Sequence, residues 1–163
     1  MSIPARGLVV LLAGTLLAGC GFQMRGATKL PEDVRNVHVA GPLVFVDEIE
    51  VFLESGGASV TEDEEAADAI VNVGQETYQR RVLSVDPNTG KDREFQFVYT
   101  VRFSISRPDG TIAVDPEGIR IVRDYVFDQD QVLGKSREDT VLREEMRRDA
   151  AQELVRRMEV RLQ

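Results

Sequence analysis

Residues 95–106 read FQFVYTVRFSIS, and this stretch decides the fold because it carries the clearest pattern in the chain. Apolar and polar side chains alternate along it, which is the two-residue period of a β-strand with one face turned towards a core. The apolar register comprises Phe95, Phe97, Tyr99, Val101, Phe103 and Ile105. The other register is mostly polar, as expected for an antiparallel sheet that is covered on one side only.

Turn-forming residues bound this strand at both ends. The segment 86–90, DPNTG, precedes it, and the segment 107–110, RPDG, follows it. Both segments are rich in the residues that favour tight turns. A strand with a bulge at Gly74 is predicted over residues 69–85, and another strand over residues 119–127. These three long strands form a meander, and residues 34–40 predict a short strand before it.

Two segments have the period of amphipathic helices. The first has its apolar stripe at Phe45, Val46, Ile49, Phe52 and Leu53, and Gly56-Gly57 ends it. The second runs from Ser136 to the C-terminus, where Ser136 and Asp139 resemble a capping box;. Its apolar stripe comprises Leu142, Met146, Ala150, Ala151, Leu154, Val155 and Met158. Both stripes are expected to pack in the core.

These elements predict an α+β fold. We expect a two-layer sandwich with a mostly antiparallel four-stranded sheet and two helices on one face, in the order β-α-β-β-β-α. At 163 residues, 42% hydrophobic and 29% charged, the chain suits one ordinary globular domain;. We place that domain at residues 31–163, behind a tether at residues 20–30.

The first nineteen residues have the pattern of an export signal. Arg6 supplies the positive start, and residues 7–17 form an almost unbroken apolar run;. That run is well short of the roughly 20 residues that a membrane-spanning helix needs. Residues 1–19 are therefore predicted to be a signal peptide, in preference to a permanent transmembrane helix.

Cys20 follows the apolar run and is the only cysteine of the chain. An exported protein with one cysteine cannot form an internal disulfide, which leaves a free thiol, an intermolecular bridge or a modified residue. The segment 17–20, LAGC, resembles the lipobox of bacterial lipoproteins. The resemblance implies cleavage before Cys20 and acylation of that residue, and several acyl chains hold a protein durably at a membrane.

The charge of the chain is acidic but unevenly distributed. The formal charge is −8, and removal of residues 1–19 takes away Arg6, which leaves −8 − 1 = −9. This balance argues against a nucleic-acid partner. Residues 28–68 contain two basic and eleven acidic side chains, whereas residues 79–107 contain six basic and three acidic ones. We therefore expect an acidic end and a basic end.

The chain offers few groups for catalysis. Its one histidine, His38, lies in a predicted strand and is more simply explained as a strand residue than as a catalyst;. The acidic run at residues 62–65 lacks the ligand spacing of a calcium loop and is expected to be solvated. Arg123 interrupts the apolar register of its strand and is expected to be a paired structural arginine. We predict no enzyme activity, no metal site and no cofactor.

Several segments together resemble the LptE family of lipopolysaccharide-assembly lipoproteins. They are residues 20–26 (CGFQMRG), 94–97 (EFQF), 123–125 (RDY), 132–135 (VLGK) before Glu138, 146–151 (MRRDAA) and 156–157 (RR). The resemblance covers almost the whole chain after Cys20. It implies an outer-membrane lipoprotein on the periplasmic side that plugs the LptD β-barrel, helps it to assemble and takes part in lipopolysaccharide transport to the cell surface.

The same resemblance implies lipopolysaccharide binding through basic residues. Lys135 stands in the matching Leu-Gly-Lys segment. The family also has an arginine in a sheet loop, and Lys91 or Arg93 lies close enough to that position to take its place. Such cations would pair with lipid phosphates. For Lys135, the alternative is a solvent-exposed lysine at the start of a helix.

Two other functions remain open from the residues alone. One is a free periplasmic lipoprotein that binds lipid in an apolar pocket without any barrel. The other is an anchored hydrolase, which would require a nucleophile and a base that the sequence does not display.

Overall fold

The computed structural model describes residues 30–126 and 135–163, with side chains of the last helix from residue 138 onwards. Its elements are β1 (Asn36–Ala40), α2 (Leu43–Ser55), β2 (Ser59–Val60), β3 (Ala69–Val73), β4 (Thr77–Val85), β5 (Asp92–Ser106), β6 (Ile112–Val126) and α3 (Lys135–Arg161). The predicted signal peptide, Cys20 and nearly all of the predicted tether lie outside the described residues.

Strand β5 is the centre of the sheet, as its alternation predicted. All six side chains of its apolar register are at most 4% exposed. The strand pairs antiparallel with β4 along one edge and with β6 along the other. Thus Tyr99 lies between Tyr78 of β4 and Ile121 of β6. The strands β4, β5 and β6 form the predicted meander.

The prediction of a mostly antiparallel four-stranded sheet is wrong. The described sheet has six strands and is mixed, in the order β2-β1-β3-β5-β4, with β6 on the other edge of β5. Strand β1 pairs parallel with both β2 and β3. The cause is α2, because a helix between two strands carries the chain back to the starting end of the sheet and makes the strands parallel.

The predicted strand 69–85 is two strands laid end to end. Strand β3 pairs with residues 103–106 of β5, and β4 pairs with residues 92–100. The backbone N–H of Gly74 still donates to the carbonyl of Arg102 at 2.8 Å, after which the chain leaves the ladder for two residues. Strand β6 also begins earlier than predicted, at Ile112, because a register shift opposite Ile105 accommodates Pro116;.

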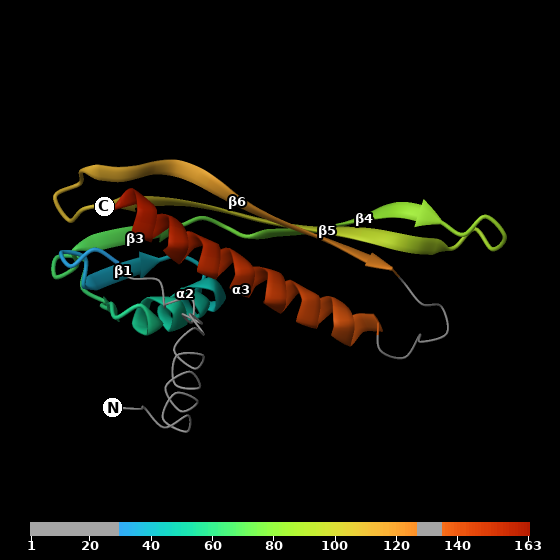
Figure 1. Cartoon of the computed structure of the whole chain (residues 1–163), viewed down its shortest axis with the longest axis horizontal. Coiled ribbons are helices and arrows are strands. Elements are labelled where there is room, and N and C mark those ends of the chain that lie inside the picture. Colours follow the sequence, from blue (N-terminus) through green and yellow to red (C-terminus); the bar gives the residue numbers. More distant parts are fainter. Residues whose placement is uncertain (1–29, 127–134) are drawn as a thin grey trace, which may run out of the picture.

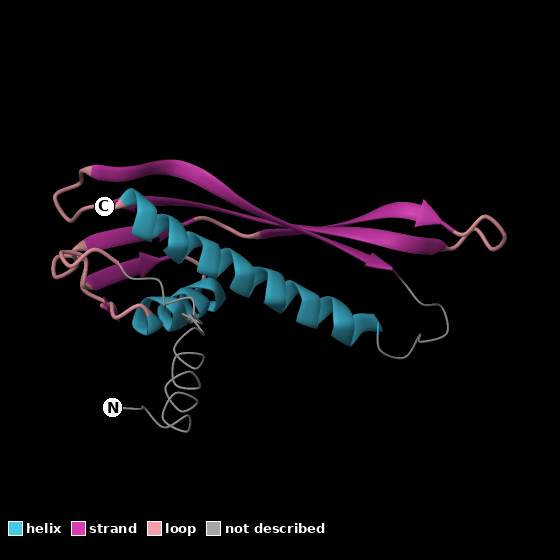
Figure 2. Cartoon of the chain, viewed as in Figure 1, coloured by secondary structure: helices cyan, strands magenta, loops and turns pink. Residues whose placement is uncertain are grey.

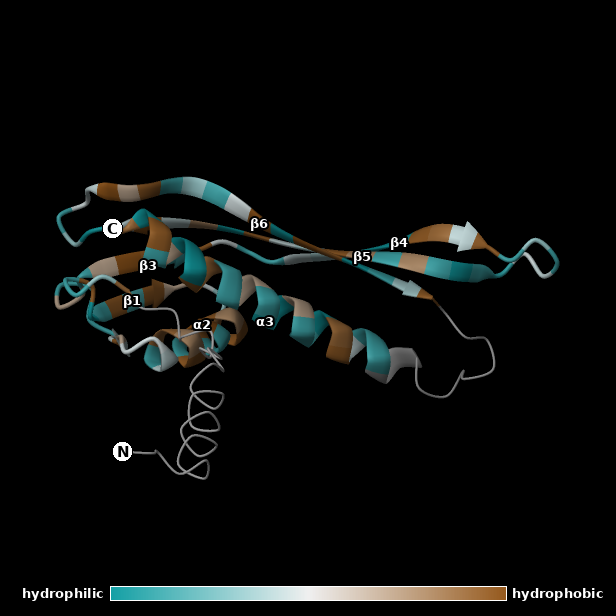
Figure 3. Cartoon of the chain, viewed as in Figure 1, coloured by the Kyte–Doolittle hydropathy of each residue, from teal (hydrophilic) through white to brown (hydrophobic). Residues whose placement is uncertain are grey.

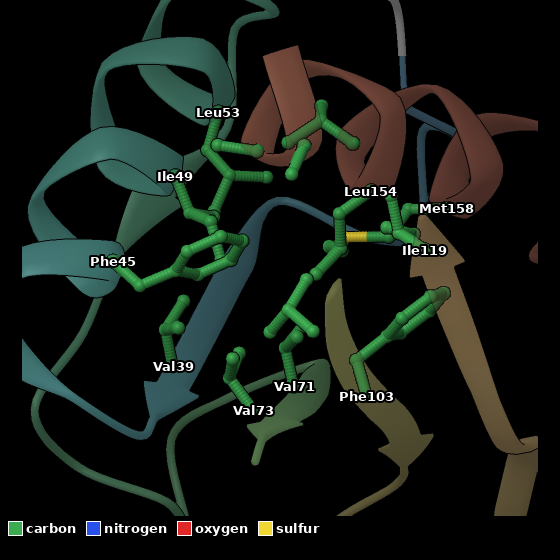
Figure 4. Close-up of a cluster of buried hydrophobic side chains, with 14 of the residues drawn as sticks. Val39, Phe45, Ile49, Leu53, Val71, Val73, Phe103, Ile119, Leu154 and Met158 are labelled. Carbon is green, nitrogen blue, oxygen red and sulfur yellow. The ribbon is translucent and has the colours of Figure 1, made fainter. Parts of the chain in front are cut away.

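Both helices lie on the same side of the sheet (Figure 1; Figure 2), which confirms this part of the predicted sandwich. Helix α2 buries Phe45, Ile49 and Leu53, and α3 buries Met146, Ala150, Ala151, Leu154, Val155 and Met158. Figure 4 shows several of these side chains meeting Val71, Phe103 and Ile119 of the sheet. Each large apolar side chain buried in this way stabilises the fold by about 1.5–3 kcal/mol.

Helix α3 is much longer than α2, and the core is therefore asymmetric. Its 27 residues span about 40 Å, at 1.5 Å per residue;. The second half of α3 packs beside α2, whereas its first half runs alone beneath the far end of the sheet (Figure 1). We call this end the distal half: β4, the turn at residues 86–91, residues 92–99 of β5, residues 120–126 of β6 and residues 135–147 of α3.

Candidate functional site

The basic residues singled out in the sequence lie in the distal half. The β4–β5 hairpin projects beyond the start of α3 (Figure 1). Lys91 and Arg93 are exposed at the tip of this hairpin. Lys135 is the first residue of α3, although its side chain lies outside the described part. The fold thus brings the three predicted positions to one end of the molecule.

Asp86 organises the hairpin tip. One of its carboxylate oxygens accepts hydrogen bonds from the backbone N–H groups of Asn88 and Thr89, both at 2.9 Å. These bonds lower the pKa of the Asp86 carboxyl below its usual range;. Gly90 follows with φ 67°, a left-handed conformation that favours glycine;. The tip is a closed, hydrogen-bonded turn that presents Lys91 and Arg93 to solvent.

Glu76 is the centre of a polar cluster beneath the sheet. It stands in the break between β3 and β4, where its carboxylate accepts hydrogen bonds from Arg147 at 2.9 and 2.8 Å and from Arg143 at 3.0 Å. The hydroxyl of Tyr99 donates to the same carboxylate at 2.5 Å. The bonds from Arg147, more than any other contact, lower the pKa of Glu76 to about 2. The cluster joins α3 to the sheet through ionised groups.

The first turns of α3 are held by tyrosine hydroxyls. Tyr78 donates to Asp139 at 2.8 Å, and Tyr125 donates to Glu138 at 2.5 Å. Tyr78 stacks on Phe97, with ring centroids 5.6 Å apart, and Phe97 meets Tyr125 edge-on. Burial and the bond to Asp139 raise the pKa of Tyr78. Asp139, predicted to form a capping box with Ser136, thus contacts the sheet, while the side chain of Ser136 lies outside the described residues.

Arg123 is a paired structural arginine, as predicted. Its guanidinium group donates to Glu145 at 3.1 Å and to Asp149 at 2.6 Å, both on α3. The bond to Asp149 is the main reason why the pKa of Arg123 is raised. Arg123 can occupy the helix-facing register of β6 because Glu145 and Asp149 of α3 neutralise its charge.

The other candidate chemical groups have structural roles. His38 lies in β1, where its Nδ1 is 2.9 Å from the carbonyl oxygen of Thr61, which confirms the strand assignment. The acidic run 62–65 is an exposed loop, as expected. Within residues 30–126 and 135–163, no set of three or more histidine, cysteine, aspartate or glutamate side chains is arranged to hold a metal ion.

The sequence does not predict the polar cluster around Glu76. Glu76 and Arg147 are 71 positions apart, so no local sequence pattern indicates that they meet. Two weak signals were present, however. Glu76 interrupts an otherwise β-forming stretch, and Tyr99 places a hydroxyl in an apolar register, where a buried tyrosine needs a hydrogen-bond partner;.

No described helix is both long and apolar enough to cross a membrane.

Comparison with known proteins gives consistent matches. The family model LptE, described as lipopolysaccharide-assembly, matches residues 40–158. The chain is 28% identical to the LPS-assembly lipoprotein LptE of Photorhabdus laumondii, over 93% of this chain and 83% of that protein. It is 32% identical to the protein of the same name from Yersinia enterocolitica, over 93% of this chain and 73% of that protein.

Solved structures share the fold. The uncharacterized lipoprotein B of Nitrosomonas europaea superposes with a TM-score of 0.70 at 26% identity, covering 86% of this chain and 91% of that one. The rare lipoprotein B of Shewanella oneidensis superposes with a TM-score of 0.66 at 24% identity, covering 76% of this chain and 93% of that one. The second likeness concerns the fold alone.

Proposed function

The chain belongs to the LptE family of lipopolysaccharide-assembly proteins, and from this premise we propose that it plugs the LptD β-barrel of the outer membrane. In this role it helps the barrel to assemble and takes part in moving lipopolysaccharide to the cell surface. The role requires a narrow domain with a polar surface, a membrane anchor and a means of contacting anionic lipid.

The observation that carries the proposal is the polar face of the sheet opposite the helices. Across the three long strands, Arg81, Gln96 and Asp124 form one row, in which Gln96 donates to Asp124 at 3.1 Å. Thr77, Thr100 and Arg120 form another row. The lumen of an outer-membrane barrel is polar, so a face rich in hydrogen-bonding groups suits its wall.

The anchor in this proposal is Cys20, which carries the lipid and holds the domain at the periplasmic leaflet of the outer membrane. Leu30, the first described residue, stands ten positions after Cys20. An extended chain of that length reaches about 35 Å. The tether therefore allows the domain to stand well clear of the lipid surface.

Lipopolysaccharide contact is assigned to Lys91, Arg93 and Lys135. The hydrogen-bonded tip presents Lys91 and Arg93 to solvent, and α3 begins in the same half of the molecule. Ammonium and guanidinium groups bind phosphate oxygens through charge-assisted hydrogen bonds. These cations would bind the phosphates of the lipid headgroup while the tip enters the path of the lipid.

A hollow among the described residues gives little support to the free lipid carrier. A hollow of about 330 Å³ lies between the start of the domain and the end of α2, and Glu32 and Arg35 are among the residues that line it. Ligand pockets of roughly 300–1,000 Å³ are normally lined mainly by apolar side chains. This hollow is at the small end of that range and carries charged groups, which suits an acyl chain poorly.

Co-purification tests the barrel proposal. The tagged full-length protein is extracted from its native membranes in mild detergent, and proteins recovered in stoichiometric amount are identified. A large outer-membrane barrel at a one-to-one ratio is expected. Recovery of the lipoprotein alone would contradict the plug and, if lipid accompanied it, would support the free carrier.

Charge reversal tests the lipid contact. We expect the triple variant Lys91→Glu, Arg93→Glu and Lys135→Glu to bind purified lipopolysaccharide at least tenfold more weakly than the parent protein. A control variant reverses Arg107, which is exposed just beyond the opposite end of β5 and should leave binding unchanged. Equal loss in both proteins would indicate a nonspecific charge effect and remove the assignment.

A further inference from the structure

One edge of β4 pairs with no other strand among the described residues. We propose that it docks an extended segment of a partner protein, which joins the sheet as an additional strand and alternates apolar with acidic side chains. The inference concerns a different surface from the polar sheet face and does not depend on the identity of the partner.

Strand β4 has one free edge within the described part of the chain. It pairs with β5 along its other edge and ends the strand order. Seven of its nine residues are exposed, so neither helix covers it. Every second residue of such a strand directs its backbone N–H and C=O groups away from the sheet, ready to pair with another chain.

The edge also exposes apolar side chains. Val82, Leu83 and Val85 are 48%, 51% and 54% exposed. Figure 3 shows a hydrophobic band near the end of β4. Exposed apolar side chains on an edge strand are unfavourable in water and are typical of a surface that a partner covers. An added strand along residues 77–82 would cover Val82 and satisfy the free backbone groups of the edge together.

The other sheet edges are less suited to this role. Strand β2 has only two residues. Strand β6 contains Pro116, which has no N–H to donate;. Strand β4 contains no proline and is bulged only at its end, after Val82. A partner strand can therefore pair regularly with residues 77–82.

Charge identifies the kind of partner. Strand β4 contains Arg80 and Arg81 and no acidic residue. Arg80 lies over the ring of Phe95 at 4.9 Å on the helix side, whereas Arg81 belongs to the opposite face. Antiparallel pairing with a second copy centred on these residues would place arginines beside arginines, which is destabilising. A strand with acidic side chains would instead neutralise them.

Position-resolved photocrosslinking tests this docking mode. A benzophenone amino acid is introduced singly at Thr77, Gln79 or Arg81 of the full-length protein in native membranes, and the crosslinked peptides are sequenced. We expect all three positions to reach one acidic, apolar-alternating segment. When the probe is moved by two residues along β4, the residue of the partner segment that it crosslinks should shift by about two positions. Leu43 and Val51, exposed apolar residues of α2, are the controls and should not reach that segment.

A charge variant sharpens the test. Arg81→Glu should reduce the crosslinking yield from Gln79 several-fold, while Arg81→Lys should retain it. Crosslinks to lipid, to a second copy of this chain or to scattered sites would each overturn the inference, as would no crosslink at all. Co-purification of a barrel without this ladder would leave the proposed function intact and remove only the docking strand.

Discussion

Arg147 of α3 reaches across to the sheet and donates two hydrogen bonds to Glu76, at 2.9 and 2.8 Å, while Tyr99 and Arg143 donate to the same carboxylate. The side chains of Arg147 and Glu76 are only 9% and 15% exposed. The apolar contacts of α3 are concentrated in its second half, so this polar contact is a main attachment of its first half.

Replacing Glu76 by glutamine should destabilise the domain by about 2–3 kcal/mol, because it leaves the buried Arg147 guanidinium without a counter-charge. Urea denaturation measures the change. Glu65→Gln, in the exposed acidic loop, is the matched control and should stay within about 0.5 kcal/mol of the parent protein;. Equal effects of the two substitutions would show that the contact between Glu76 and Arg147 adds nothing to the free energy of unfolding.

Acid should weaken the same contact. The pKa of Glu76 is lowered to about 2 from an ordinary value of 4.5, so its contribution is fully present above pH 4.5. It is lost as the pH falls from 4.5 towards 2, because the unfolded chain takes up the proton first. The stability difference between the parent protein and Glu76→Gln should therefore shrink over this interval. A difference that stays constant between pH 5 and pH 2.5 would contradict the assignment.

Gly41 is predicted to tolerate no side chain. A Cβ atom there would lie 2.8 Å from Cβ of Val73 and 2.9 Å from its carbonyl oxygen, where β1 gives way to α2 against β3. Gly41→Ala should cost about 1–3 kcal/mol, since the backbone must move to relieve the overlap. Thermal unfolding measures the loss. Gly118→Ala, whose nearest neighbour is 4.0 Å away, should show no comparable loss.

Cys20→Ser should release the protein from the membrane fraction, because the hydroxyl of serine cannot receive the thioether-linked lipid. Fractionation of cells that express the full-length chain, with metabolic labelling by a fatty acid, provides the measurement. Retention of label in the variant would show that the acyl chains are attached elsewhere. Ser2→Ala, within the signal peptide, is a control that should remain in the membrane fraction with its label.

Much of the local structure was predictable because it repeats at short range. The alternation of residues 95–106 defined β5 and its buried face, and the apolar stripes defined the core faces of α2 and α3. A paired role for Arg123 could also be inferred, since an isolated charge in an apolar register is too costly to leave unpaired. Each of these inferences rests on the chemistry of neighbouring residues or on one period.

The sequence by itself determined the family, the two helices, the meander and the basic character of residues 79–107. Only the tertiary structure decided the parallel pairing of β1 with β3, the division of residues 69–85 into two strands, and the meeting of Glu76 with Arg147. The physical reason is range. Periodicity and turn chemistry act within a few residues, whereas strand pairing and ion pairs join groups that only the folded chain brings together.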